Sequence, residues 1–161
     1  MNASDVMAFA KSRLQEKFNV PVYVDSLPQD FVRPSFALEL QKPELTELNL
    51  GLVRWTAVLL ITGYVDVDEY YDSSRELLNL LQDGVLELFS GGWLKVGDRF
   101  PTVAAIKGKG DPDFFEVQVT FTWSDARPGF SDPEETAPMM GQYELSMFAP
   151  DRVSAGEKQN I

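Results

Sequence analysis

Three aspartates, Asp66, Asp68 and Asp72, have the spacing with which a calcium-binding loop begins. Such a loop also needs an oxygen ligand at its fifth position, glycine at its sixth and glutamate at its twelfth. Tyrosine, tyrosine and leucine occupy those positions here. An acidic helix start, in which carboxylates face the positive end of the helix dipole, explains the aspartates better. We therefore predict no metal site.

A second candidate is the segment Lys107–Asp113, in which glycines stand beside lysines. Glycine-rich loops bind phosphate when they open a helix, because several backbone N–H groups then point at the anion. This segment lacks the GxxxxGK[ST] pattern of such loops, and it joins two expected strands rather than a strand and a helix. The pattern favours a hairpin turn, and we predict no cofactor.

Neighbouring carboxylates, such as Asp111 with Asp113 or Asp66 with Glu69, could serve as a catalytic acid and base. The chain has 25 acidic residues, however, so such neighbours are expected by chance. Histidine and cysteine are absent, which excludes Ser-His-Asp and Cys-His triads, HExxH metalloproteases and ordinary zinc sites. We therefore predict that the protein is not an enzyme and has no catalytic residues.

The overall charge is acidic, with 14 Lys and Arg against 25 Asp and Glu, for a net charge of −11. Such a surface repels phosphates, which disfavours direct binding of DNA or RNA. It either keeps the protein soluble or forms a wall past which DNA slides without sticking. The longest apolar run, Ala57–Ile61, is far too short to span a bilayer. The N-terminus has no signal-peptide pattern, and the lack of cysteine fits a reducing compartment.

Two amphipathic helices are expected to position these segments. Ser4 is a suitable N-cap for the first, whose apolar residues recur at helical spacing up to Phe18, and Asn19 can end it. Ser73 and Glu76 have the spacing of a capping box at the start of the second. Its broad apolar stripe comprises Leu77, Leu78, Leu80, Leu81, Val85, Leu86, Leu88 and Phe89.

Apolar runs predict five or six strands. They are Val20–Val24, Phe36–Gln41, Leu50–Val65, Trp93–Val96, Thr102–Ile106 and Phe114–Trp123. Pro21 confines the first to a sheet edge, and Pro43 is expected to end the second. The third is unusually long and largely apolar on both sides, so both of its faces must be covered. A neighbouring subunit could supply part of that cover.

The order helix, strands, helix, strands predicts an α+β fold, with one mainly antiparallel sheet and two helices packed on one face. We place this domain at residues 1–125. Residues 126–161 are expected to form an irregular, extended C-terminal arm. An island of strand-like alternation in the arm could add a strand to another subunit's sheet edge, or pack back on its own domain. Its candidate partner-binding residues are Tyr143, Leu145, Met147 and Phe148.

The order and spacing of these elements resemble the tail terminator family of long-tailed phages and phage-tail-like particles. The resemblance lies in Lys17–Tyr23, Arg33–Leu38, the long strand Val53–Ile61, the helix Glu76–Phe89 and the strand Phe115–Trp123. It covers about residues 4–125 and includes no catalytic signature. The resemblance implies a structural virion protein that forms a hexameric ring, caps the tail tube, ends tail polymerisation and joins the tail to the neck.

The partners implied by the resemblance are further copies of the chain, the tail tube protein, a neck or connector protein, and the sheath where a particle has one. DNA would pass through the ring without specific binding, and no membrane is involved. The implied location is the virion tail, assembled in the bacterial host cytoplasm. Three alternatives remain open: another head–tail or neck completion protein, a small acidic monomeric binding or inhibitor protein, and a carboxylate-dependent enzyme.

Overall fold

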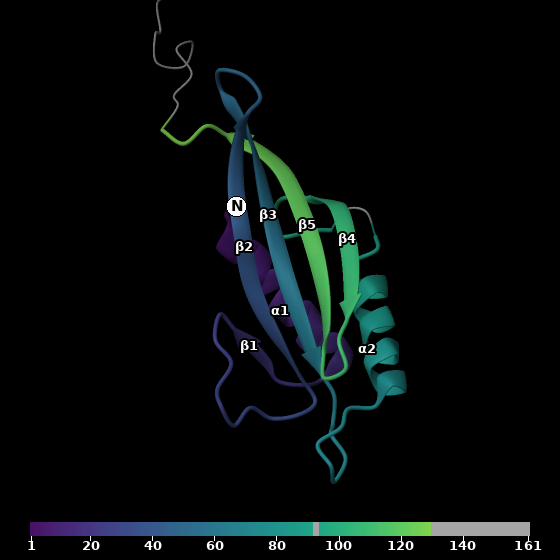
Figure 1. Cartoon of the computed structure of the whole chain (residues 1–161). Helices are drawn as coiled ribbons and strands as arrows, with labels where there is room; N and C mark the ends of the chain where they lie inside the picture. Colours follow the sequence, from purple (N-terminus) through teal and green to yellow (C-terminus); the bar gives the residue numbers. More distant parts are fainter. Residues whose placement is uncertain (92–93, 130–161) are drawn as a thin grey trace, which may run out of the picture. The chain divides into compact units, whose positions relative to one another are not determined.

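A computed structural model describes residues 1–91 and 94–129 of the chain, and residues 1–125 form one unit of it. Two helices and five strands make up the described part (Figure 1). In chain order they are α1 (Ala3–Phe18), β1 (Val22–Val24), β2 (Ser35–Glu47), β3 (Leu52–Tyr64), α2 (Arg75–Leu88), β4 (Thr102–Gly110) and β5 (Phe115–Ala126). The expected α+β class is confirmed.

The five strands form one sheet in the order β1-β2-β3-β5-β4. The short β1 runs parallel to β2, while β2 pairs antiparallel with β3, and β4 with β5. Trp55 of β3 stacks on Trp123 of β5, with ring centroids 6.2 Å apart, and Gly63 lies against Phe115. These two contacts join early β3 to late β5 and late β3 to early β5, so this central pair is antiparallel too. The sheet is therefore mainly antiparallel, as predicted.

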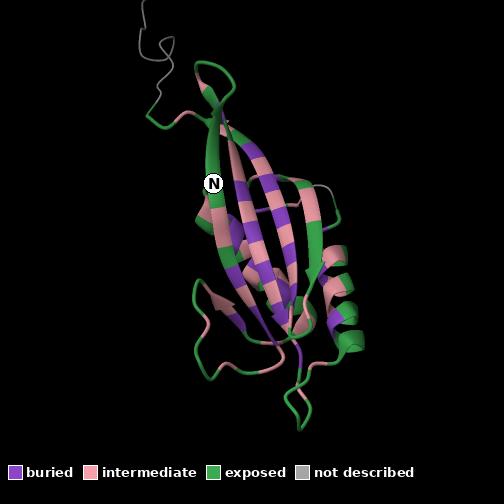
Figure 2. Cartoon of the chain, viewed as in Figure 1, coloured by how far each residue is buried: buried purple, intermediate pink, exposed green. Residues whose placement is uncertain are grey.

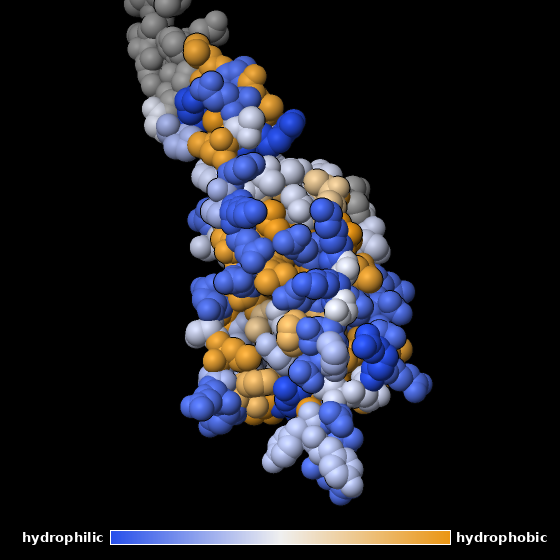
Figure 3. Space-filling model, viewed as in Figure 1, coloured by the Kyte–Doolittle hydropathy of each residue, from blue (hydrophilic) through white to orange (hydrophobic). Residues whose placement is uncertain are grey.

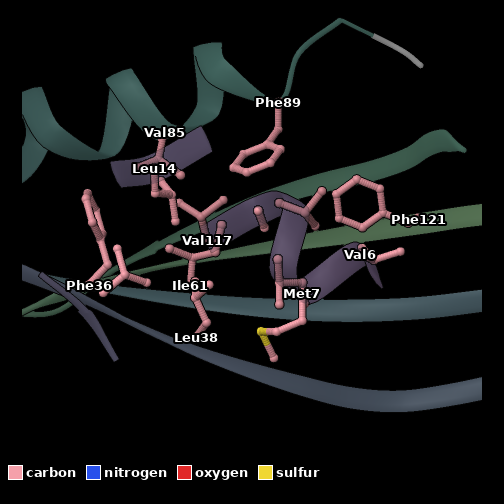
Figure 4. Packing of buried hydrophobic residues seen from close by; sticks show 14 of the residues in the cluster. Val6, Met7, Leu14, Phe36, Leu38, Ile61, Val85, Phe89, Val117 and Phe121 are labelled. Atoms are coloured by element: carbon pink, nitrogen blue, oxygen red, sulfur yellow. The ribbon is translucent and has the colours of Figure 1, made fainter. Parts of the chain in front are cut away.

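One face of the sheet packs against both helices and forms the core. Every second residue of β5 is buried on this face, from Phe115 to Trp123, and β3 alternates in the same way (Figure 2). Leu14 of α1 and Val85 of α2 are fully buried against this face (Figure 4). The helix-facing side supplies most of the apolar burial. Burying one such side chain contributes about 1.5–3 kcal/mol to folding.

The start of α1 differs from the prediction. Asn2, and not Ser4, is the N-cap, because its side chain accepts a hydrogen bond from the backbone N–H of Asp5. The carboxylate of Asp5 accepts one in return from the N–H of Asn2, which completes a capping box. The end of α1 is as expected, since Asn19 adopts a left-handed conformation with φ 52°.

Two strand boundaries were also predicted wrongly. Pro43 does not end β2, which continues to Glu47, because the register shifts between Gln41 and Glu44 and Pro43 lies inside this bulge. The strand expected at residues 93–96 is reduced to a single bridge between Val96 and Arg99, with residue 93 outside the described part. Helix α2 takes Ser74 rather than Ser73 as its N-cap.

Candidate functional site

The aspartates that resemble a calcium loop hold their own loop together. Asp68 accepts hydrogen bonds on Oδ1 from the backbone N–H of Tyr70 at 2.8 Å and of Asp72 at 2.9 Å. Its oxygen is thus used by the turn between β3 and α2. Within residues 1–91 and 94–129, no group of three or more acidic residues is arranged to hold a metal ion.

The lysine- and glycine-rich segment is mostly strand rather than turn, which corrects the prediction that β4 stops at Ile106. The strand extends to Gly110, and the turn is closed by the N–H of Asp111, which donates to the carbonyl of Phe114 at 3.0 Å. A Cβ at Gly108 would lie 2.9 Å from Nε2 of Gln82, so α2 approaches β4 closely here. That amide also donates to the carbonyls of Lys109 and Glu116, tying α2 to both strands.

The paired carboxylates lie apart from any enclosed site. Asp66, Glu69 and Asp113 are exposed, and the carboxylate of Asp111 accepts a hydrogen bond from the N–H of Asp113 at 3.1 Å. This arrangement closes a turn. It does not place an acid and a base on opposite sides of a substrate-sized cavity.

An open hollow of about 660 Å³ lies beside the start of β4. Its acidic lining residue Asp98 lies 3.9 Å from Arg99, and Arg99 also contacts Asp125 at 2.9 Å. The N-terminal ammonium of Met1 lies 3.5 Å from the same Asp125 carboxylate. These contacts tie the N-terminus and the link before β4 to the end of β5, which is a structural role.

Tyr64, at the end of β3, is a titratable side chain with a shifted pKa. Burial raises the pKa of its phenol above 10.0, the positive charge of Arg33 opposes that rise, and the negative charge of Glu116 adds to it. The Arg33 guanidinium lies over the rings of Phe31, at 4.9 Å, and of Tyr64, at 5.3 Å. Its Nη1 donates to the carbonyl of Val65 at 3.0 Å. This cluster anchors the loop before β2.

The sheet face that points away from the helices, here called the outer face, is covered by no helix or strand in the described residues. Its residues on β3 include Val58 and Leu60, which are half-buried. The amide of Gln118 on β5 donates to Gln41 on β2 at 3.3 Å and so reaches over β3. Figure 3 shows apolar and polar patches interleaved on this face.

Exposed leucines gather at the hairpin between β2 and β3, here called the leucine tip. They are Leu45, Leu48, Leu50 and Leu52, and Leu50 is 79% exposed. The turn is well defined, since Asn49 Oδ1 accepts hydrogen bonds from the N–H groups of Gly51 and Leu52. The hairpin thus carries four exposed leucines, and clustered exposed apolar side chains are a feature of protein contact surfaces.

A second apolar surface lies along α2, whose apolar stripe is wider than the core needs. Leu78 and Val85 are buried, but Leu80 is 69% exposed and Leu77 is also exposed. They border an apolar groove of about 330 Å³. The groove is lined by Phe18, Pro34, Val65, Asp66, Leu77, Leu80 and Leu81.

The predicted partner-binding residues Tyr143, Leu145, Met147 and Phe148 lie outside the described residues. Neither the leucine tip nor the exposed side of α2 was predicted from the sequence. The signal for the tip was present, because Leu45, Leu48, Leu50 and Leu52 surround Asn49 and Gly51 in the sequence, a composition typical of a turn with apolar residues where polar ones are usual.

The described surfaces therefore include exposed apolar side chains at the leucine tip and along α2. Neither helix in the described part is long and apolar enough to cross a membrane. No curated protein matches the chain. A family model described as "Phage tail terminator protein" matches residues 5–128, which is well over half of the chain and includes all five strands, α2 and all but the first two residues of α1. The chain therefore belongs to the phage tail terminator family, and so to the structural proteins of phage tails.

Proposed function

We propose that this protein forms a hexameric ring that caps the tail tube, ends tail polymerisation and joins the tail to the neck. The observation that carries the proposal is the family match over residues 5–128. A protein with this role works by binding, so it needs several contact surfaces and no reactive centre. The leucine tip, the exposed side of α2 and the outer face are three such surfaces.

The apolar exposure supports assembly on physical grounds. Leu50 and Leu80 lie on different elements, on the β2–β3 hairpin and on α2, and each is more than two thirds exposed. Burying such side chains against a partner is favourable by roughly 25 cal/mol per Å² of apolar surface. A ring subunit on a tube end has a neighbour on each side, the tube below it and the neck above it, so several separate surfaces would be used.

The acidic composition supports a role next to moving DNA. A net charge of −11 repels phosphates, so a ring of such chains would let DNA pass without holding it. The proposed partners are further copies of the chain, the tail tube protein, a neck or connector protein and the sheath where one is present. The proposed location is the virion tail, after assembly in the host cytoplasm. Tyr143, Leu145, Met147 and Phe148 are proposed as an additional contact to one of these partners.

The test is tube length. Tail tube protein is polymerised with and without this chain, and the products are measured by negative-stain electron microscopy. We expect shorter tubes with a ring at one end when the chain is present. Tubes of unchanged length with bare ends would overturn the capping role. A ring found only on the portal side would favour another neck completion protein, and a monomer that binds one basic partner would favour a small acidic inhibitor.

A further inference from the structure

The sheet ends in two open edges. On one side β1 pairs only with Phe36–Leu38, so residues 40–46 of β2 have no strand beyond them in the described part of the chain. On the other side β4 is the last strand, with α2 beside its second half (Figure 1), and its residues 107–110 are exposed (Figure 2). An open edge presents backbone N–H and C=O groups that can pair with a further strand.

The two edges carry opposite charges on the same face. Glu39 and Glu44 of β2 lie opposite Leu60 and Thr56 of β3, which places both carboxylates on the outer face. Lys107 and Lys109 of β4 lie opposite Gln118 and Glu116 of β5, which places both ammonium groups on the outer face too. All four charged side chains are exposed, and none has an ion pair within the described residues.

The strand directions also fit. Because β2, β3, β5 and β4 are successively antiparallel, the two edge strands β2 and β4 run in opposite directions. A copy related by rotation about an axis along the strands keeps its strand direction. Its β2 would therefore lie antiparallel to β4 of its neighbour, the commoner strand pairing. The outer faces would be continuous, and the lysines of β4 would lie across from the glutamates of β2.

We propose that the free edge of β2 in one copy pairs with the edge of β4 in the next, with Lys107 and Lys109 facing Glu39 and Glu44. This interface rests on the ring proposed above and supplies its contact. Because it joins two different surfaces, the same interface can repeat from copy to copy. The copies form a closed ring when a whole number of the rotations between neighbours adds up to 360°.

A simpler interpretation is that these charges protect the edges. Charged side chains, prolines and bulges all discourage edge strands from aggregating, and β2 has Pro43 and a bulge at this place. Protection needs charge of either sign on each edge. Pairing needs opposite signs on the two edges, and Lys42 in the bulge is the single cation in the stretch 39–47 of β2.

Charge reversal separates these interpretations. Native mass spectrometry over a concentration series compares the wild type with K107E/K109E, with E39K/E44K and with the variant carrying all four changes. Each double variant should raise the apparent dissociation constant on the order of tenfold or more, because like charges then face each other. The four-fold variant should recover wild-type assembly. The control K11E/K95E has the same charge change as K107E/K109E and should assemble as the wild type does.

Cysteine cross-linking tests the geometry independently, since the wild-type chain has no cysteine. Glu44→Cys is mixed in turn with Ala105→Cys, Lys107→Cys and Lys109→Cys under oxidation. We expect a dimer from at least one mixture and none from any single variant alone. Gln118→Cys on β5 is the control, because it lies one strand further in, at about 10 Å from the partner strand, beyond disulfide reach.

The outcomes are distinct. A cross-linked dimer from a single variant alone would show two identical edges meeting and would overturn the proposal. A ring that forms without any mixed cross-link would overturn this interface but leave the ring. A wild-type chain that stays monomeric at every concentration and gives no cross-link would overturn both. Unchanged assembly of both double variants would assign the charges to edge protection.

Discussion

The two faces of the sheet are made by the same strands but differ in what covers them. On the helix-facing side, residues such as Phe121 and Ile61 are fully buried under α1 and α2. On the outer face, residues such as Thr120 and Leu60 remain half-exposed beside charged and amide side chains. The difference indicates that the helix-facing side supplies the core of the fold, while the outer face and the sheet edges carry the contacts proposed above.

The largest effect is expected from Phe121→Ala. Phe121 is fully buried and meets Phe89 edge-to-face at 6.2 Å, so its truncation leaves a cavity and should lower the free energy of unfolding by about 3–5 kcal/mol. Thr120→Ala, one residue away on the outer face, should change it by less than about 1 kcal/mol. Urea unfolding followed by circular dichroism measures both. Equal losses would remove the distinction between the faces.

Gly63→Ala tests the packing of the helix-facing side by adding volume to the core instead of removing it. A methyl group at Gly63 would overlap the ring of Phe115, so we expect a loss of about 1–3 kcal/mol from overpacking. Gly110→Ala is the matched control, since its nearest neighbour would be the Arg75 side chain at 3.7 Å. Thermal unfolding of the two variants should show a clearly lower midpoint for Gly63→Ala alone. A stable Gly63→Ala protein would mean that Phe115 has room to move.

Arg33→Ala sharpens the comparison within the outer face. Arg33 contacts two aromatic rings and donates a hydrogen bond to the Val65 carbonyl, so its loss should cost about 1–2 kcal/mol. Arg54→Ala, also on the outer face but exposed, should be near neutral. The denaturant midpoints of the two variants show whether Arg33 contributes more to stability than Arg54 does. If both are neutral, the Arg33 cluster contributes nothing to the loop that it contacts.

The smallest effect concerns pH. Because burial raises the pKa of Tyr64 above 10.0, the folded state keeps the phenol proton at a pH where the unfolded chain has released it. Stability from this group is therefore present below about pH 10 and falls as pH rises from there through the folded pKa. Tyr64→Phe should flatten the fall in urea midpoint between about pH 9 and about pH 11. An unchanged slope in this variant would assign the alkaline loss to other groups.

Much of the fold could be predicted from the sequence because apolar periodicity records burial. The alternation from Phe115 to Trp123 and the helical spacing up to Phe18 both gave the right element and the right face. The bulge at Pro43 and the extension of β4 through Gly108 could not be predicted, because they depend on register and on the approach of α2. The local pattern predicted that a strand ends at Pro43 and that Gly108 lies in a turn.

The contact surfaces were harder to predict than the core. The apolar residues of α2 fit a single buried stripe in the sequence, and only the packed structure separates buried Leu78 from exposed Leu80. The charge pattern of the sheet edges could not be predicted from the sequence either. Glu39 and Lys107 are far apart in the chain, and their relation depends on a strand order in which β5 lies between β3 and β4.

The short strand β1 limits where a further strand can pair along β2. β1 pairs with three residues of β2, the last of which is Leu38. A strand from another copy that paired along β2 would therefore meet β1 as a barrier just before Glu39. Such a barrier would prevent slippage toward β1, and a slip of one residue would turn every side chain to the opposite face. Each junction would then repeat with the same angle. That uniformity separates a closed circle from an open spiral, in which a small error at every step accumulates.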